Sequence, residues 1–254
     1  MIKFFRKIRQ DLLSTGKTGK YFKYAIGEIV LVVIGILIAL QINNWNESNQ
    51  KSKKQIELLT SLRNEINADI IYMSRQDSIY SIVENKFKIG INLFYKARNI
   101  KDIDSVNQFT PQLWNDFSIN KNTYNEMLNS GDMYQIKNKP LQENIVKYYL
   151  NAEEYRYYFR EITKELSHLF VKTPDIYPYK FLVSQINNPK INMASIDTTW
   201  INNPSSPTYQ AIVVFFERNQ EYNIEYRKKV YKRMMSDADS LVNEIYKELG
   251  NMNK

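Results

Sequence analysis

The chain has 254 residues, no cysteine, seven glycines and a net charge of +8. The absence of cysteine excludes thiol catalysis and cysteine-ligated metal sites, and so few glycines disfavour a β-rich fold with many tight turns. Seven lysines and arginines before residue 25, against one acid, supply +6 of the net charge. The high pI is therefore not that of a nucleic-acid-binding surface, and we expect no nucleic-acid partner.

The most informative segment is an apolar run, IVLVVIGILIAL, at Ile29–Leu40. Aromatic residues flank it at Tyr24 and Trp45, and a helix between them spans about 31 Å, close to the roughly 30 Å of a bilayer's hydrocarbon core. No small-residue cleavage pattern follows the run. We therefore predict an uncleaved transmembrane anchor at residues 25–45, in contact with membrane lipid. A buried helix of a soluble protein is the alternative.

The residues before the anchor, 1–24, form a basic arm. Positive charge on one flank of a span favours a cytoplasmic location for that flank. We expect a cytoplasmic N-terminus, a single pass, and residues 46–254 across the membrane. Within the arm, Ile2–Leu13 has the pattern of a short interfacial helix, and an irregular basic arm is the alternative.

Two features of the anchor suggest contacts inside the membrane. Gly27, Gly35 and Ala39 lie on one helical stripe, and small residues let two membrane helices approach closely. A parallel homodimer through this stripe is one expectation, and another membrane protein as partner is the alternative. Glu28 is an acid near one end of the span. An ionisable residue in a span is a functional candidate, although at this depth its carboxylate can also reach the interface.

Helical periodicity continues beyond the anchor. An apolar stripe beginning at Ile56 predicts one long helix that ends near Arg98. We expect a polar connector over 99–110, a short helix around 111–117, and a helix at 123–129 that stops at Gly131.

The clearest pattern is a run of apolar residues with alternating steps of four and three, typical of a helix seam packed against a partner helix. Pro140 suits the first turn of this helix, and we expect the long first helix to be the partner. The seam residues are Leu141, Ile145, Tyr148, Ala152, Tyr155, Phe159, Ile162, Leu166 and Leu169.

The C-terminal part contains a proline-rich segment and a final helix. Residues 171–207 hold five of the seven prolines and are predicted to be irregular, whereas 208–249 has helical periodicity. The predicted fold is all-α: an N-terminal transmembrane helix followed by an antiparallel long-helix bundle that occupies 46–254.

Candidate chemistry is sparse. His168 is the single histidine and flanks the seam. Glu65 and Asp69 are four residues apart, and we expect a solvated helix face there. The aromatic residues between Tyr148 and Phe159 could stack on a ligand, but core packing is favoured because several belong to the seam. We identify no catalytic residue, cofactor site or metal site, and expect no enzyme.

The opening MIKFFRKIRQ and the anchor GKYFKYAIGEIVLVVIGILIALQINNWNE resemble a widespread family of Bacteroidetes membrane proteins that carries a domain-of-unknown-function label. The resemblance continues, more weakly, in LLTSLRNEINADI, in TYNEMLNSGDMYQIKNKPLQENIVKYY and in the closing helix. It implies a Gram-negative inner-membrane setting and no activity; in that setting the orientation expected from the charge places residues 46–254 in the periplasm.

Three functions are compatible with this sequence. The first is a non-enzymatic interaction or assembly module anchored in the inner membrane. The second is a small-ligand sensor that acts through a partner, with a pocket between the tyrosine-rich helix and the proline-rich segment. The third is an accessory subunit of an ion-driven membrane complex, for which Glu28 would be the functional acid.

Overall fold

The computed structural model describes residues 18–111, 115–172 and 197–252. Helices and connecting turns make up these residues and no strand occurs among them, which confirms the predicted all-α fold. The chain divides into two compact units, Met1–Glu57 and Leu58–Lys254, which are described separately below.

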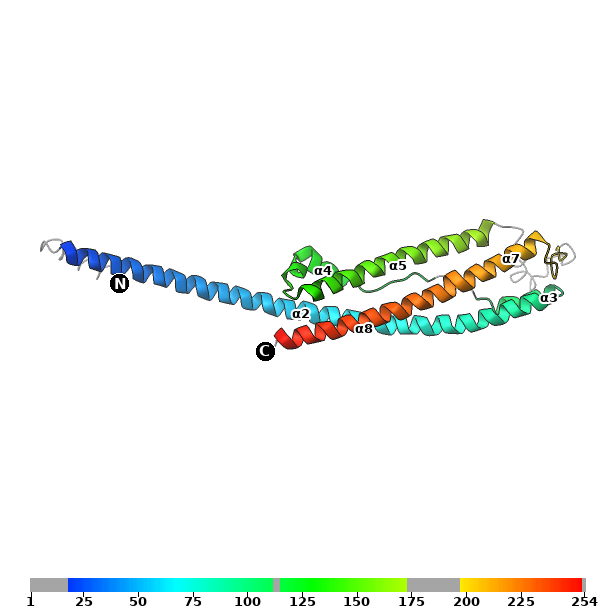
Figure 1. Cartoon of the computed structure of the whole chain (residues 1–254), viewed down its shortest axis with the longest axis horizontal. Helices are drawn as coiled ribbons and strands as arrows, with labels where there is room; N and C mark the ends of the chain where they lie inside the picture. Colours follow the sequence, from blue (N-terminus) through cyan, green and yellow to red (C-terminus); the bar gives the residue numbers. More distant parts are fainter. Residues whose placement is uncertain (1–17, 112–114, 173–196, 253–254) are drawn as a thin grey trace, which may run out of the picture. The chain divides into compact units, whose positions relative to one another are not determined.

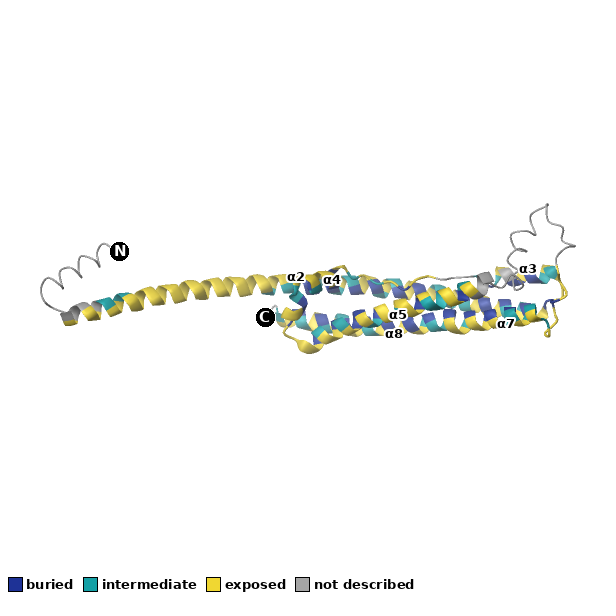
Figure 2. Ribbon diagram, turned by 90° about the horizontal axis from the view of Figure 1, so that it is seen from above, coloured by how far each residue is buried: buried dark blue, intermediate teal, exposed yellow. Residues whose placement is uncertain are grey.

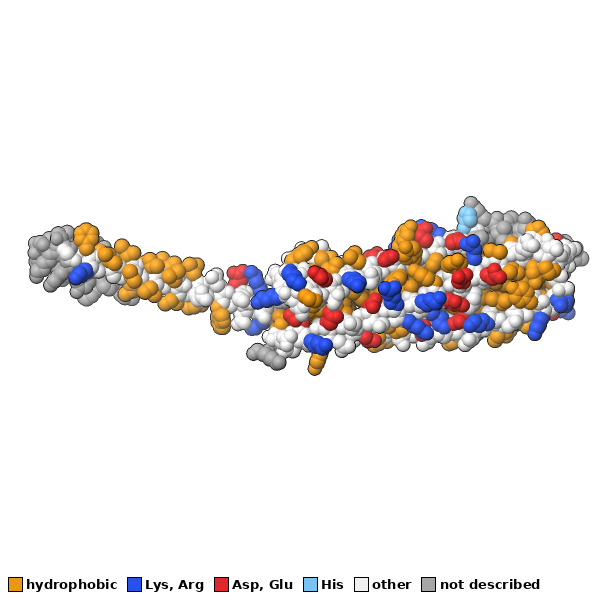
Figure 3. Space-filling model, in the orientation of Figure 1, with side chains coloured by type: hydrophobic (Ala, Val, Ile, Leu, Met, Phe, Trp, Pro, Cys, Tyr) orange, Lys and Arg blue, Asp and Glu red, His pale blue; other side chains and the backbone are white. Residues whose placement is uncertain are grey.

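The first unit contains the beginning of α2 (Thr18–Lys96). Neither proline nor any helix-stopping cap interrupts this sequence, so one helix covers both the predicted anchor and the predicted long helix. Every side chain from Ile29 to Leu40 is exposed (Figure 2), and the surface there is a run of hydrophobic side chains (Figure 3). An 18-residue window with a mean hydropathy of 2.6 and no buried residue makes this helix apolar enough to cross a membrane. The predicted interfacial helix at residues 2–13 lies outside the described residues.

The second unit is built from the remainder of α2, from α5 (Lys139–Lys172), and from α7 (Pro207–Arg218) followed by α8 (Tyr226–Met252). Its core consists of side chains that recur every three or four residues along each helix, as burial of one helical face requires. On α2 the buried apolar residues are Leu58, Leu59, Leu62, Ile66, Met73, Tyr80, Val83, Phe87 and Phe94.

The observed helix directions show that the predicted antiparallel arrangement is wrong for one pair of helices. α7 and α8 run antiparallel to α2 and α5, as expected, but α2 and α5 run parallel to each other (Figure 1). The chain between them returns along α2, because Asn115 contacts Gln76 and Asn120 contacts Asp69 closer to the start of the bundle. α5 therefore starts at the same end of the bundle as this part of α2.

The predicted polar connector over 99–110 is instead largely helical, as α3 (Ile100–Gln108). Asn99 and Asp102 form a reciprocal capping box: Asn99 Oδ1 accepts from the Asp102 N–H at 3.2 Å, and Asp102 Oδ2 accepts from the Asn99 N–H at 3.2 Å. Ile103 and Val106 anchor the helix in the core. This capping pair was the sequence signal for α3.

The predicted helix near 123–129 is α4 (Asn122–Ser130), and it ends at Gly131 as expected. Gly131 has a φ of 78°, a left-handed conformation that favours glycine, and its N–H bonds to Leu128 O. The predicted helix around 111–117 is wrong in its described part, because residues 115–121 are not helical.

The final helix is predicted correctly in extent but contains an irregularity. A π-helix, Asn219–Glu225, joins α7 to α8. Buried Asn219, Asn223 and Arg227 follow one another in steps of four. Residues four apart lie on one helix face, so these three polar side chains point to the core together.

Candidate functional site

The non-helical segment 115–121 lies among the helices of the second unit. Phe117 is buried, and its ring centroid lies 5.5 Å from that of Phe159 on α5 and 5.8 Å from that of Tyr231 on α8. Inserting such a segment into a bundle brings backbone polar groups that no helix satisfies, and these groups need partners. The polar side chains at the core positions of the helices supply those partners.

α2 contributes three of these side chains. Asn115 Nδ2 donates to Gln76 Oε1 at 3.3 Å. The carboxylate of Asp69 accepts from the Asn120 N–H at 3.0 and 3.2 Å and from Asn120 Nδ2 at 2.8 Å. Glu65 accepts from the Thr123 N–H at 3.2 Å and from Thr123 Oγ1 at 2.8 Å. The three partners hold the returning chain along α2.

Asp69 is the most deeply buried of these acids, with 2% of its surface exposed. Burial raises its pKa to about 6, and the hydrogen bonds from Asn120 oppose this rise, while the negative charge of Glu65 adds to it. A carboxylate in this position is therefore costly when it is ionised.

The expectation that Glu65 and Asp69 form a solvated face is wrong. Glu65 serves as the N-terminal cap of α4, since Lys121 at the cap position makes no side-chain hydrogen bond of its own there. Its contact with Thr123 joins residues 58 positions apart in the chain. Only the folded structure brings these two groups together.

Arg227, at the start of α8, is fully buried. Nη1 donates to the carbonyl of Asn115, while Nη2 donates to Thr163 Oγ1 at 2.8 Å and to Phe159 O at 3.2 Å. The guanidinium lies 4.2 Å from the centroid of the Phe159 ring, a cation–π contact. Burial lowers the pKa of this guanidinium.

Sequence analysis did not single out Arg227. It occupies the core register, three residues after Ile224 and four before Tyr231, both of which are buried. A charged residue at such a position signals a buried polar contact, and this was the available clue. Asp69 gave the same clue on α2, three residues after buried Ile66.

The predicted seam lies on α5 and faces the core for most of its length. Of its nine residues, Leu141, Ile145, Tyr148, Ala152, Phe159 and Leu166 are buried, Tyr155 and Ile162 are half-buried, and the side chain of Leu169 lies outside the described residues. The main helical partner of α5 is α8 rather than α2. The segment 115–121 explains this difference, because it contacts both α5 and α2.

The predicted packing residues of the anchor are exposed within the first unit. A Cβ atom added at Gly27 or Gly35 would have nothing within 4 Å, and Ala39 is exposed. Glu28 is half-exposed. The roles of the small-residue stripe and of the intramembrane acid stay predictions.

The described residues contain no group of three His, Asp or Glu side chains that could hold a metal ion. His168 is exposed near the end of α5. The buried polar groups described above bind backbone and side-chain atoms of segment 115–123. Their contacts hold this segment against α2, α5 and α8 and so stabilise the fold.

These features define an all-α protein with a helical bundle and one helix apolar enough to span a membrane. Residues 28–173 match the model of a protein family described as a family of unknown function, DUF6090, and the chain belongs to this family. The matched region runs from the anchor to the end of α5, and α7 and α8 lie beyond it. Comparisons with curated proteins and with solved structures gave no match.

Proposed function

We propose that the protein is a non-enzymatic interaction or assembly module anchored in the inner membrane of a Gram-negative bacterium of the Bacteroidetes. Its basic arm lies in the cytoplasm, its single span crosses the membrane, and its helical bundle occupies the periplasm. The charge asymmetry of the arm supports this orientation. The exposed apolar helix supports the membrane location.

The observation that carries the assembly role is a row of exposed isoleucines on the outer face of α2. Ile71, Ile82 and Ile89 have exposed fractions of 64%, 58% and 46%. Their spacings of eleven and seven residues keep them within about 20° of one line along a helix. Single exposed apolar residues are ordinary, and polar Arg75, Ser78 and Asn85 lie between these three; we propose that the shared line of the isoleucines marks a contact with a partner helix.

The proposed partner is a second copy of the chain in parallel orientation. A small-residue stripe at Gly27, Gly35 and Ala39 offers one contact in the membrane, and the isoleucine row offers another in the bundle. Both surfaces lie on α2, and two-fold pairing places each surface against its own copy.

Disulfide cross-linking in native membranes tests this proposal, because the chain has no cysteine of its own. We expect Asn46→Cys to cross-link efficiently. Gly35→Ile should reduce cross-linking if the membrane stripe holds the dimer, whereas Leu37→Phe, which adds bulk on the opposite helix face, should not.

The bundle contact is tested in the same way. Replacing Ile71, Ile82 and Ile89 by glutamine should weaken cross-linking if the isoleucine row contributes. A parallel purification from native membranes asks whether another protein accompanies the chain. A protein that neither cross-links nor co-purifies with any partner would contradict the assembly role.

A further inference from the structure

The second unit has an open cleft between α5 and α8 that none of the roles above uses. It encloses about 470 Å³, a volume within the range of small-molecule sites. Each helix contributes residues at i, i+3, i+4 and i+7, so one face of each helix forms one wall. The residues used below are Asn151, Tyr155 and Tyr158 on α5 and Tyr226, Lys229 and Arg233 on α8.

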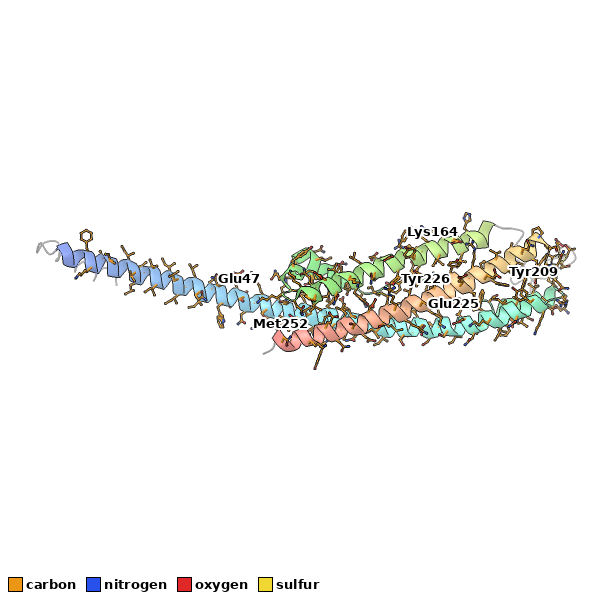
Figure 4. All side chains as sticks on the ribbon, viewed as in Figure 1. Glu47, Lys164, Tyr209, Glu225, Tyr226 and Met252 are labelled. Carbon is orange, nitrogen blue, oxygen red and sulfur yellow. The ribbon has the colours of Figure 1, made fainter. Side chains whose placement is uncertain are left out.

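Three tyrosines give the cleft flat apolar surfaces with polar edges. Tyr226 lies on the side of α8 that faces α5 (Figure 4), with its ring centroid 6.2 Å from that of Phe159. Burial raises the pKa of Tyr226, and the phenols of Tyr155 and Tyr158 and the carboxylate of Glu154 raise it further. The three phenol groups line the same cleft, where they can stack on a ring and hydrogen-bond to its substituents.

Two cations lie on the α8 wall. Among the residues that the structure describes, neither Lys229 nor Arg233 forms an ion pair, whereas neighbouring Lys228 is paired with Glu84. Among the described residues that line this cleft, Glu154 is the only acid. The cleft thus has an excess of positive charge on its α8 wall. The guanidinium of Arg233 can bind a carboxylate through two parallel hydrogen bonds.

The π-helix sets the orientation of this wall. It ends at Glu225, immediately before Tyr226, and one extra residue in a helix turns all following side chains by about 100°. After this rotation, Arg227 faces the core, and Tyr226, Lys229 and Arg233 face the cleft. π-helices occur frequently at functional sites because they re-aim side chains in this manner.

We infer that the cleft between α5 and α8 binds a small ring compound that carries a carboxylate. The ring stacks on Tyr158 and Tyr226, and the carboxylate binds Arg233 and Lys229. Asn151 supplies a further hydrogen-bonding group. A sugar acid and an aromatic acid both satisfy this chemistry, and the probes below separate these two sources.

The test uses the full chain in detergent micelles, with binding measured by saturation-transfer NMR and calorimetry. Glucuronate and glucose form the acidic and neutral pair for the sugar source, and phenylacetate and 2-phenylethanol form the pair for the aromatic source. For ligands of this size a dissociation constant of about 1 mM is expected for the acid that fits. The neutral member of the same pair should bind about tenfold more weakly.

Variants locate the binding. Arg233→Met and Lys229→Met should each weaken the acid about tenfold and remove its advantage over the neutral compound. Tyr158→Leu should weaken both members of the pair by a similar factor. The matched controls are Tyr157→Leu and Lys232→Met, which change exposed neighbours on the same two helices that do not line the cleft, and these should leave binding within about twofold.

The inference is overturned if neither acid binds, if the neutral compounds bind as tightly as the acids, or if the control variants weaken binding as much as the cleft variants. Circular dichroism of each variant establishes that the helices remain intact. Because binding and cross-linking are measured separately, a protein that dimerises without binding either acid contradicts only this inference.

Discussion

Replacement of Asp69 by asparagine should stabilise the protein at neutral pH. Asp69 is 2% exposed and its pKa is raised to about 6 from an ordinary value of 3.8. A raised carboxyl pKa contributes stability that is complete below the unfolded value of 3.8 and is lost as the pH rises through about 6. The difference between the folded pKa of about 6 and the ordinary value of 3.8 corresponds to about 3 kcal/mol of unfolding free energy, at 1.36 kcal/mol per pH unit.

Asparagine cannot ionise, yet it keeps an oxygen that can accept the Asn120 N–H. The free energy of unfolding of Asp69→Asn should therefore be similar to that of the wild type near pH 4 and higher by up to about 3 kcal/mol at pH 7. Urea unfolding of the full chain in detergent, followed by circular dichroism from pH 4 to 7, measures this difference. Asp239→Asn, at an exposed position on α8, is the control. A difference that stays constant with pH, or that falls as the pH rises, would refute the assignment of a destabilising charge to Asp69.

Three further substitutions test the fold. Gly131→Ala should destabilise the bundle by about 1 kcal/mol because φ is 78° there, whereas Gly250→Ala, with nothing within 4 Å of the added Cβ, should be neutral or slightly stabilising in thermal unfolding. Gly90→Ala places a Cβ 2.5 Å from Thr110 Cγ2 and should cost about 1–2 kcal/mol, and Thr110→Ser in the same chain should recover much of this loss. If Thr110→Ser has no effect, the contact with Thr110 Cγ2 is not the cause, and the loss comes from the Phe109 carbonyl, whose oxygen lies 3.1 Å from the added Cβ. Glu65→Ala removes the cap of α4 and should cost about 1–2 kcal/mol in urea unfolding, and unchanged stability would contradict the capping role.

Periodicity predicted the long helices well because apolar side chains recur with the period of the helix. The stripe from Ile56 and the pattern after residue 208 correspond to α2 and to α7–α8. The stop at Gly131 was predictable because a left-handed residue favours glycine. α3 was missed although Asn99 and Asp102 carry a capping-box signal at the required spacing.

The polar contacts could not be predicted because they join residues far apart in the chain. Arg227 meets Asn115 across 112 positions, and Asp69 meets Asn120 across 51. No local sequence pattern predicts that segment 115–121 enters the bundle, because its backbone forms hydrogen bonds with distant side chains such as those of Asp69 and Arg227. The partner of the seam was mispredicted for the same reason.

The cleft shows a similar limit. The tyrosines of α5 were visible in the sequence as a group that could stack on a ligand. The cations that accompany them come from α8, about 75 residues further on. A π-helix fixes their direction, and no periodicity argument predicts such a turn.

The location of the bundle across the membrane from the basic arm is tested most directly by labelling single thiols in a chain that has none. In cells with a permeabilised outer membrane, a membrane-impermeant maleimide should react with Asn251→Cys, at the exposed end of α8. It should not react with Lys7→Cys until the inner membrane is broken. Labelling of Lys7→Cys with protection of Asn251→Cys, or labelling of both in intact inner membranes, would contradict a cytoplasmic arm and a periplasmic bundle.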